Sequence, residues 1–188
     1  MFDSSYPICF VQAKRENDES KHLKTFIYKF RSPVTKLKYI VRAELHEGEV
    51  FTIKFYPSNL KHSDHKYSLL THKFDVSRII MTVGEVVVIL LKQFPDACFA
   101  FYGSPTFDKK RKQLEQGSLN KRYRVYFEFV KRAFGTETFA HFTYFDLNGY
   151  LLVNRKHLNV DQKEQEIAQM FIETYQQLPE DISLVLHD

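Results

Sequence analysis

Three segments in the first third of the chain, 25–30, 36–45 and 50–56, are rich in β-branched and aromatic residues that alternate with polar ones. Alternation with a period of two is typical of strands that bury one face against a core. The stretch 46–49 between the second and third segments has the length and the glycine of a hairpin turn. We therefore expect an antiparallel meander, completed by a fourth strand at 65–74.

A single helical pattern follows the meander. Apolar residues recur at helical spacing from Val76 to Phe94, where Pro95 ends the pattern. Either Asp75 or Ser77 is in position to cap the N-terminus of this segment. The pattern predicts one long and largely buried helix.

The next segment, 97–103, is apolar, alternates poorly and ends at a glycine, so it is expected to form a short strand buried on both faces. Ser104 and Pro105 then have the form of a helix N-cap and a first-turn proline. They predict a helix over 105–134, with a break at 117–118 where a glycine interrupts it.

The last third of the chain predicts a hairpin and a helix. Strands at 138–145 and 150–155 flank an Asn-Gly pair, which is a strong signal for a tight hairpin turn. Asp161 with Glu164 three residues later has the form of a capping box, and an amphipathic pattern then runs to about residue 178.

The expected element order is ββββ-α-β-α-ββ-α, in which strands cluster instead of alternating with helices. Such clustering favours an α+β fold with a mainly antiparallel sheet and helices packed on one face. The 188 residues suit an irregular lead-in at 1–24, a single α+β domain at 25–156, and a C-terminal helix and tail at 157–188. The helix and tail are the candidate for contacts in a homo-oligomer.

The net charge of +4 is distributed unevenly. Residues 109–132 contain nine basic and two acidic residues, a net charge of +7. Such asymmetry is the electrostatic footprint of a surface that meets phosphates or another polyanion. The alternative interpretation is a solvated helix face. The basic residues are Lys109, Lys110, Arg111, Lys112, Lys121, Arg122, Arg124, Lys131 and Arg132.

A strand that ends at Gly103, followed by a helix that starts at Ser104, would point backbone N–H groups and the positive end of the helix dipole outward, an arrangement that binds anions. Aromatic residues interleave with the cations of 121–134, a combination that holds single-stranded nucleic acid when the rings are exposed and forms core when they are not. The expected anion and nucleic-acid contacts are Ser104, Lys109, Lys110, Arg111, Lys112, Lys121, Arg122 and Arg124.

Several familiar chemistries have no motif in this chain. There is no GxxxxGK[ST] or GxGxxG segment for a nucleotide cofactor and no GxSxG nucleophile motif, so we expect no cofactor. His62 and His65 lack cysteine partners, so a solvated loop is expected there and no metal site. The two cysteines lie far apart, the first twenty residues lack a signal-peptide pattern, and charges interrupt the longest apolar stretch, within 76–94. These features predict a reduced, cytoplasmic protein that does not cross a membrane.

The order of an apolar helix, the sequence FAFYGS, a basic turn and a basic amphipathic helix that ends at AFG resembles a family of small proteins, mainly from Bacteroidetes, known as the domain of unknown function DUF6934. The resemblance covers about residues 25–156. Gly103, Ser104 and Pro105 match that family, and Lys109 to Arg111 stand roughly where its arginines fall. It supports the fold boundaries and the basic segment, and it implies no known activity.

The leading hypothesis is a non-enzymatic cytoplasmic binding domain that contacts nucleic acid or another polyanion through the basic segment 104–132, with single-stranded nucleic acid preferred to duplex. One alternative is a small, metal-independent RNase of toxin type, in which His141, Tyr144, Lys109 and Arg111 converge. Another is a protein-interaction or oligomerisation module that uses the aromatic strands and the last helix.

Overall fold

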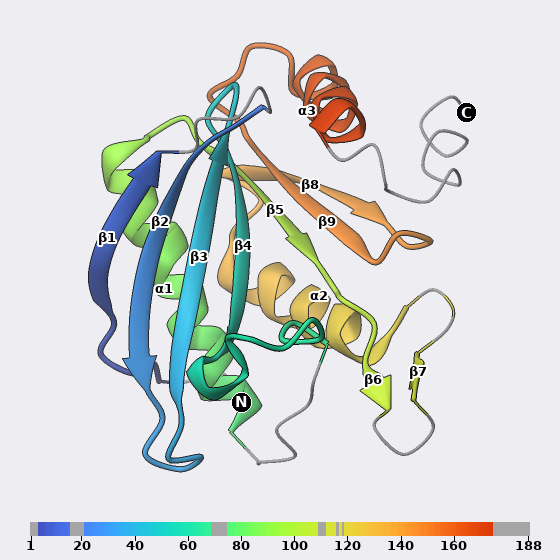
Figure 1. The fold of residues 1–188 in the computed structure, drawn as a ribbon. Coiled ribbons are helices and arrows are strands. Elements are labelled where there is room, and N and C mark those ends of the chain that lie inside the picture. Colours follow the sequence, from blue (N-terminus) through green and yellow to red (C-terminus); the bar gives the residue numbers. More distant parts are fainter. Residues whose placement is uncertain are drawn as a thin grey trace.

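The computed structural model describes residues 4–15, 21–68, 75–108, 112–115, 117 and 119–174. They form an α+β fold with the predicted order of a four-strand meander, helix, strand, helix, hairpin and helix (Figure 1). The strands of the main sheet are β1 (Cys9–Arg15), β2 (His22–Arg31), β3 (Lys38–His46), β4 (Val50–Pro57), β5 (Cys98–Tyr102), β8 (Phe139–Tyr144) and β9 (Gly149–Asn154). The helices are η1 (Ser58–Leu60), α1 (Val76–Gln93), α2 (Lys121–Ala133) and α3 (Val160–Thr174).

The main sheet has seven strands in the order β1-β2-β3-β4-β5-β9-β8. Every neighbouring pair is antiparallel except β4 and β5, which are parallel because α1 carries the chain back between them. This parallel pairing extends only over residues 50–52 and 98–100. Beyond it the two strands diverge, so the sheet is forked between β4 and β5 (Figure 1).

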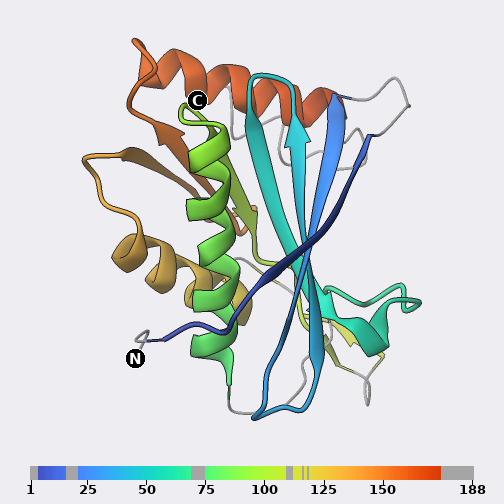
Figure 2. The same ribbon diagram turned by 90° about the vertical axis from the view of Figure 1, so that its left-hand side faces the viewer.

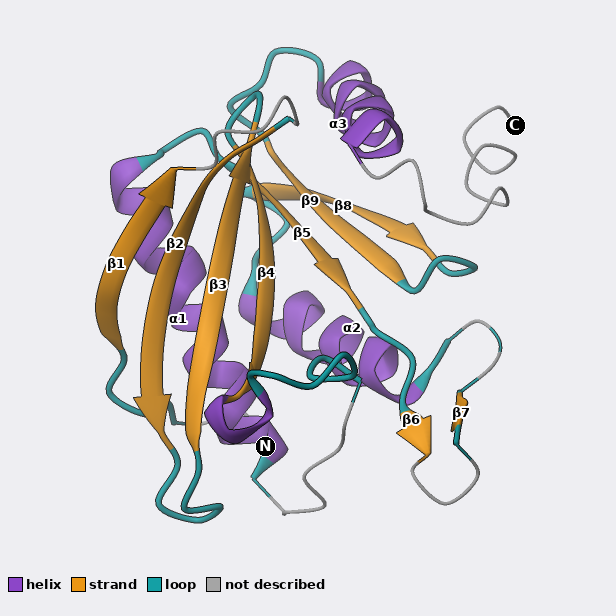
Figure 3. Cartoon of the chain, viewed as in Figure 1, coloured by secondary structure: helices purple, strands orange, loops and turns teal. Residues whose placement is uncertain are grey.

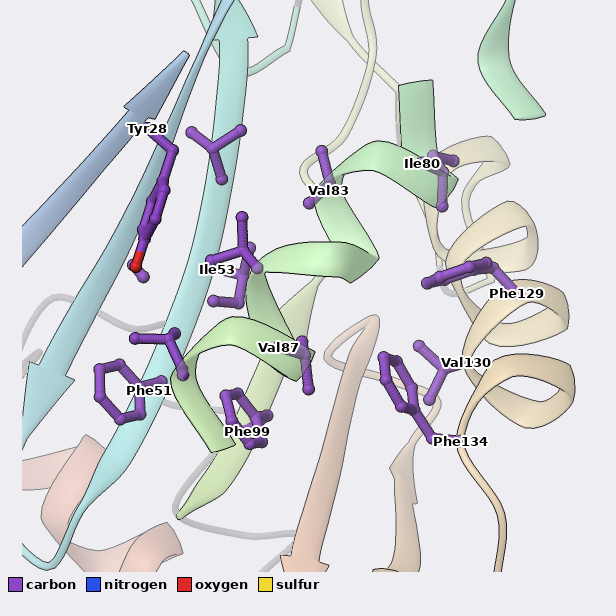
Figure 4. Close-up of a cluster of buried hydrophobic side chains, with 14 of the residues drawn as sticks. Tyr28, Phe51, Ile53, Ile80, Val83, Val87, Phe99, Phe129, Val130 and Phe134 are labelled. Carbon is purple, nitrogen blue, oxygen red and sulfur yellow. The ribbon is translucent and has the colours of Figure 1, made fainter. Parts of the chain in front are cut away.

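Helices α1 and α2 lie on the same side of the sheet and enclose the main core with it (Figure 2). Aromatic and branched side chains from β2, β4 and β5 meet those of the two helices there (Figure 4). The helices approach closely at Gly84, where a Cβ atom would lie 2.4 Å from Cζ of Phe129. Glycine at this position therefore allows the Phe129 ring to pack directly against the α1 backbone.

Helix α3 lies on the opposite side of the sheet. Neighbouring residues of β9 point to opposite faces, so that Leu152 joins the main core whereas Leu151 and Val153 pack with Ile167 and Met170 of α3. The expectation that the helices pack on one face thus holds for α1 and α2 but is wrong for α3. No helix among the described residues is long and apolar enough to span a membrane.

The four-strand meander has the predicted number of strands but a different membership. Residues 9–15 form β1, although 1–24 was expected to be an irregular lead-in. All seven residues of this edge strand are exposed, so it carries no alternating burial pattern that sequence reasoning could detect. The predicted strand at 65–74 is wrong for residues 65–68, because 61–68 form successive hydrogen-bonded turns. Residues 69–74 lie outside the described part of the chain.

The predicted helix over 105–134 begins only at Lys121. The preceding segment contains a two-stranded hairpin, β6 (Phe107–Asp108) and β7 (Gln113–Leu114), drawn apart from the main sheet in Figure 3. Three residues with positive φ are incompatible with a continuous helix, because every residue of a right-handed α-helix has a negative φ. They are Lys112 (φ 53), Gly117 (φ 95) and Leu119 (φ 57).

Two expected caps are also replaced. The Asp75 carboxylate does not cap α1 but accepts hydrogen bonds from the hydroxyls of Tyr6 (3.0 Å) and Ser32. At α3 the side chain of Asn159 accepts from the backbone N–H of Gln162 at 3.0 Å, which is the N-cap role predicted for Asp161.

Candidate functional site

The N-terminus of α2 binds a carboxylate of the chain itself. The Glu115 side chain accepts hydrogen bonds from the backbone N–H groups of Thr106 (3.2 Å) and Lys121 (3.3 Å). Partial burial acts to raise the pKa of Glu115, but the hydrogen bonds from Thr106 and Lys121 outweigh it and hold the pKa below its ordinary value. The helix end therefore attracts an anion, as helix N-termini do, but Glu115 is already that anion.

Ser104 is not at a helix end. Its backbone N–H donates to the carbonyl of Tyr102 at 3.2 Å, and the chain continues into β6 instead of a helix. The side chain of Asn120 caps α2 in its place by accepting from the N–H of Tyr123 at 2.9 Å. The sequence-based anion site at Ser104 is therefore wrong in its geometry.

The predicted cations divide into three groups. Lys121 and Arg124 are exposed on α2, as is Lys112 in the hairpin. Lys109, Lys110 and Arg111 lie outside the described residues. Arg122 is half-buried: its guanidinium donates to the carbonyl of Tyr67 and lies beside the Tyr126 hydroxyl. Arg122 thus anchors the loop 61–68 to α2.

The exposed side of α2 is cationic along its length. Lys121, Arg124, Lys131 and Arg132 are exposed there with a single carboxylate, Glu128, which pairs with Arg132 at 3.2 Å. The opposite side of the helix is core: Tyr123, Phe129 and Val130 are buried. The aromatic residues of this helix are therefore packing residues, in agreement with the second interpretation of the interleaved pattern.

Of the four residues of the RNase alternative, the two that are described, His141 and Tyr144, do not come together, and Lys109 and Arg111 lie outside the described residues. His141 lies on the face of the sheet that packs against α2. Its Nδ1 atom is 2.7 Å from the hydroxyl of Tyr150 on β9, and burial lowers the pKa of His141. Tyr144 lies on the other face of the sheet, where its hydroxyl donates to Glu164 of α3.

Near the fork, the His65 ring stacks on the Phe107 ring, with 3.9 Å between the ring centroids. No cluster of His, Cys, Asp or Glu suited to a metal occurs in the described residues.

A second cationic surface was not predicted. It is the face of β1–β4 that points away from α1, which we call the open sheet face, and it lies below α3 in Figure 1. Strand register places six basic side chains and one carboxylate on it: Lys14, Lys29, Arg31, Lys38, Arg42, Lys54 and Glu44. The alternation of basic residues at 29 and 31 is visible in the sequence as a cationic strand face. Only the strand register shows that Arg31 lies opposite Lys38 and that Lys29 is on the same face as Arg42.

At the centre of this face, Arg42 and Lys54 bind the same carboxylate. Glu44 accepts from Nε of Arg42 at 3.1 Å and from Nζ of Lys54 at 2.6 Å, and it is 5% exposed. Burial acts to raise the pKa of Glu44, but Lys54 and Arg42 outweigh it and lower the pKa. The carboxylate is therefore ionised and neutralises one of its two cations.

The loop 61–68 borders the same face at the fork. The Tyr56 and Tyr67 rings meet edge to face at 5.4 Å, and the Lys66 ammonium lies 5.6 Å and 5.4 Å from their respective centroids. Burial raises the pKa of Tyr67 to about 12, so its hydroxyl stays protonated as a hydrogen-bond donor.

No protein-family model, curated protein or solved structure matches this chain. The resemblance to the Bacteroidetes family stays a prediction.

Proposed function

We propose that this protein is a binding domain that contacts nucleic acid or another polyanion through the exposed cations of α2. The observation that carries the proposal is the row of Lys121, Arg124, Lys131 and Arg132, in which Glu128 is the one acidic residue of α2 and Glu115 lies at the N-terminal end. Phosphate contacts need charge and exposure more than they need a sequence motif. Because the other side of α2 is core, these cations are held on a fixed scaffold.

The geometry supports binding better than catalysis. The RNase alternative requires both His141 and Tyr144, and these two side chains are on opposite faces of the sheet. A general acid and a general base must both reach the reacting phosphate, and side chains on opposite faces do not.

The test is fluorescence anisotropy with labelled single-stranded RNA, single-stranded DNA and duplex DNA over a range of salt concentrations. The variant is Lys121→Gln/Arg124→Gln, and the charge-matched control is Lys92→Gln/Lys156→Gln, two exposed lysines outside α2. We expect the α2 variant to lower the salt slope on single strands by about 1.4, or about 0.7 for each lost contact. A slope equal to that of the control would overturn the proposal, and cleaved probe would favour the RNase.

A further inference from the structure

The open sheet face carries an electrostatic cost that the fold alone does not explain. Arg31 and Lys38 are direct cross-strand partners on β2 and β3, and both are exposed. Like charges directly opposite each other in a sheet are destabilising. Arg42 and Lys54 form a second such pair on β3 and β4. Only this second pair has a carboxylate, Glu44, between its members in the described part of the chain.

The cations also form a regular array. Lys29 and Arg31 are alternate residues of β2, and same-face residues of a strand are about 6.8 Å apart. This spacing is close to that of successive phosphates along an extended single strand. The half-buried Ile27 and Ile40 fill the surface between the cations, so the face combines charge with apolar area.

Rings border the array on one side. Tyr56 continues the row of Lys29 and Ile40 across the sheet but is only 6% exposed, and the half-buried Tyr67 packs against it from the loop at the fork. Arg122 and the backbone bond from the N–H of Phe107 to the carbonyl of Ser68, at 3.0 Å, hold that loop in place. Single-stranded nucleic acid binders combine a cationic track with exposed aromatic surface, and of these two rings only Tyr67 keeps part of its surface exposed.

We propose that the open sheet face is a second binding surface, distinct from α2, and that its ligand is single-stranded nucleic acid. Lys29, Arg31 and Lys38 contact phosphates, and Arg42 with Lys54 extends the cationic track toward the half-buried ring of Tyr67. An extended single strand follows the rows of a sheet and offers bases to its apolar positions, whereas duplex keeps its bases paired and stacked inside. The inference goes beyond the proposed function because it uses a different surface.

The test uses the full chain, a labelled twelve-nucleotide oligouridylate and the variant Arg31→Gln/Lys38→Gln. The same Lys92→Gln/Lys156→Gln control removes equal charge elsewhere. At 0.1 M salt each phosphate contact contributes up to about fivefold in affinity for single strands, so the variant should bind up to about 25-fold more weakly than the control. Its thermal unfolding should be unchanged or shifted upward, which separates lost contacts from lost fold.

The outcomes distinguish the two surfaces. If the sheet variant binds like the control while the α2 variant is weakened, this inference fails and the proposed function stands. If only the sheet variant is weakened, the sheet face stands and the α2 assignment fails. Duplex bound as tightly as the oligouridylate, or self-association of the wild type that the sheet variant abolishes, would overturn single-stranded nucleic acid as the ligand.

Discussion

Arg42 and Lys54 are direct cross-strand partners, and both reach the carboxylate of Glu44 between them. Two like charges on facing residues repel, so the pair depends on this one ionised group. Three strands are tied together as a result, because Arg42 also donates to Thr25 of β2 at 3.4 Å. This cluster fixes the geometry of the open sheet face.

Glu44→Gln removes the shared charge and should destabilise the fold. Loss of one partner of a buried ion pair costs about 3–5 kcal/mol, but Arg42 and Lys54 are 30% and 36% exposed and partly screened by solvent. We therefore expect a loss of about 1–3 kcal/mol in denaturant unfolding. Glu47→Gln breaks only the exposed pair with Lys21 and serves as the control, which should unfold like the wild type. Equal stability of both variants would contradict the role of Glu44.

Arg31→Gln/Lys38→Gln should raise stability while it weakens binding. Removing the repulsion between two facing like charges should raise the free energy of unfolding by about 0.2–1 kcal/mol, the range that cross-strand pairs contribute. Chemical denaturation at low salt measures the gain, which added salt should reduce by screening. A variant less stable than the wild type would show that these two cations stabilise the fold, contrary to this account.

The strands of the meander were predictable because they bury one face. Buried and more exposed residues alternate over much of β2 and β3, whereas β1 is exposed throughout and gives no such pattern. The start of α2 was misplaced because Ser104 and Pro105 resemble a helix start, while the left-handed residues before Lys121 leave no comparable signal. The cations of α2 were recognised because they are contiguous. Those of the open sheet face were missed, because strand pairing alone makes Arg31 and Lys38 neighbours.

His46 should make stability depend on pH. Burial, followed by the charge of His22, lowers the pKa of His46 to about 4, while Glu44 raises it and Lys54 lowers it slightly. The unfolded chain has a histidine pKa of about 6.5, so it binds a proton that the folded protein excludes. Stability should therefore fall as the pH decreases from about 6.5 to 4, by on the order of 3 kcal/mol.

Denaturant unfolding at several pH values tests this, with His46→Phe as the comparison. The His46 ring is fully buried and meets Phe171 of α3 edge to face, so an aromatic replacement keeps the packing. The variant should lose most of the pH dependence above pH 4.5, where Glu44 with its lowered pKa is still ionised. An unchanged pH slope would show that His46 does not cause it.

Gly84→Ala should destabilise the contact between α1 and α2. Alanine in a helix interior normally gains about 0.5–1 kcal/mol over glycine, but the new methyl would overlap the buried Phe129 ring. Overpacking costs about 1–3 kcal/mol, so a net loss of about 1–2 kcal/mol is expected in denaturant unfolding. Gly135→Ala, with open space around its Cβ, should show no loss. Adding Phe129→Leu should reduce the penalty, and a Gly84→Ala variant as stable as Gly135→Ala would contradict the packing.

The most direct test of the account is the salt dependence of single-stranded RNA binding by the wild type, Lys121→Gln/Arg124→Gln and Lys92→Gln/Lys156→Gln. We predict that affinity falls with salt, that the α2 variant has a slope smaller by about 1.4, and that the control keeps the wild-type slope. No binding by the wild type at low salt, or the same slope for all three proteins, would contradict the assignment of α2 as a polyanion-binding surface.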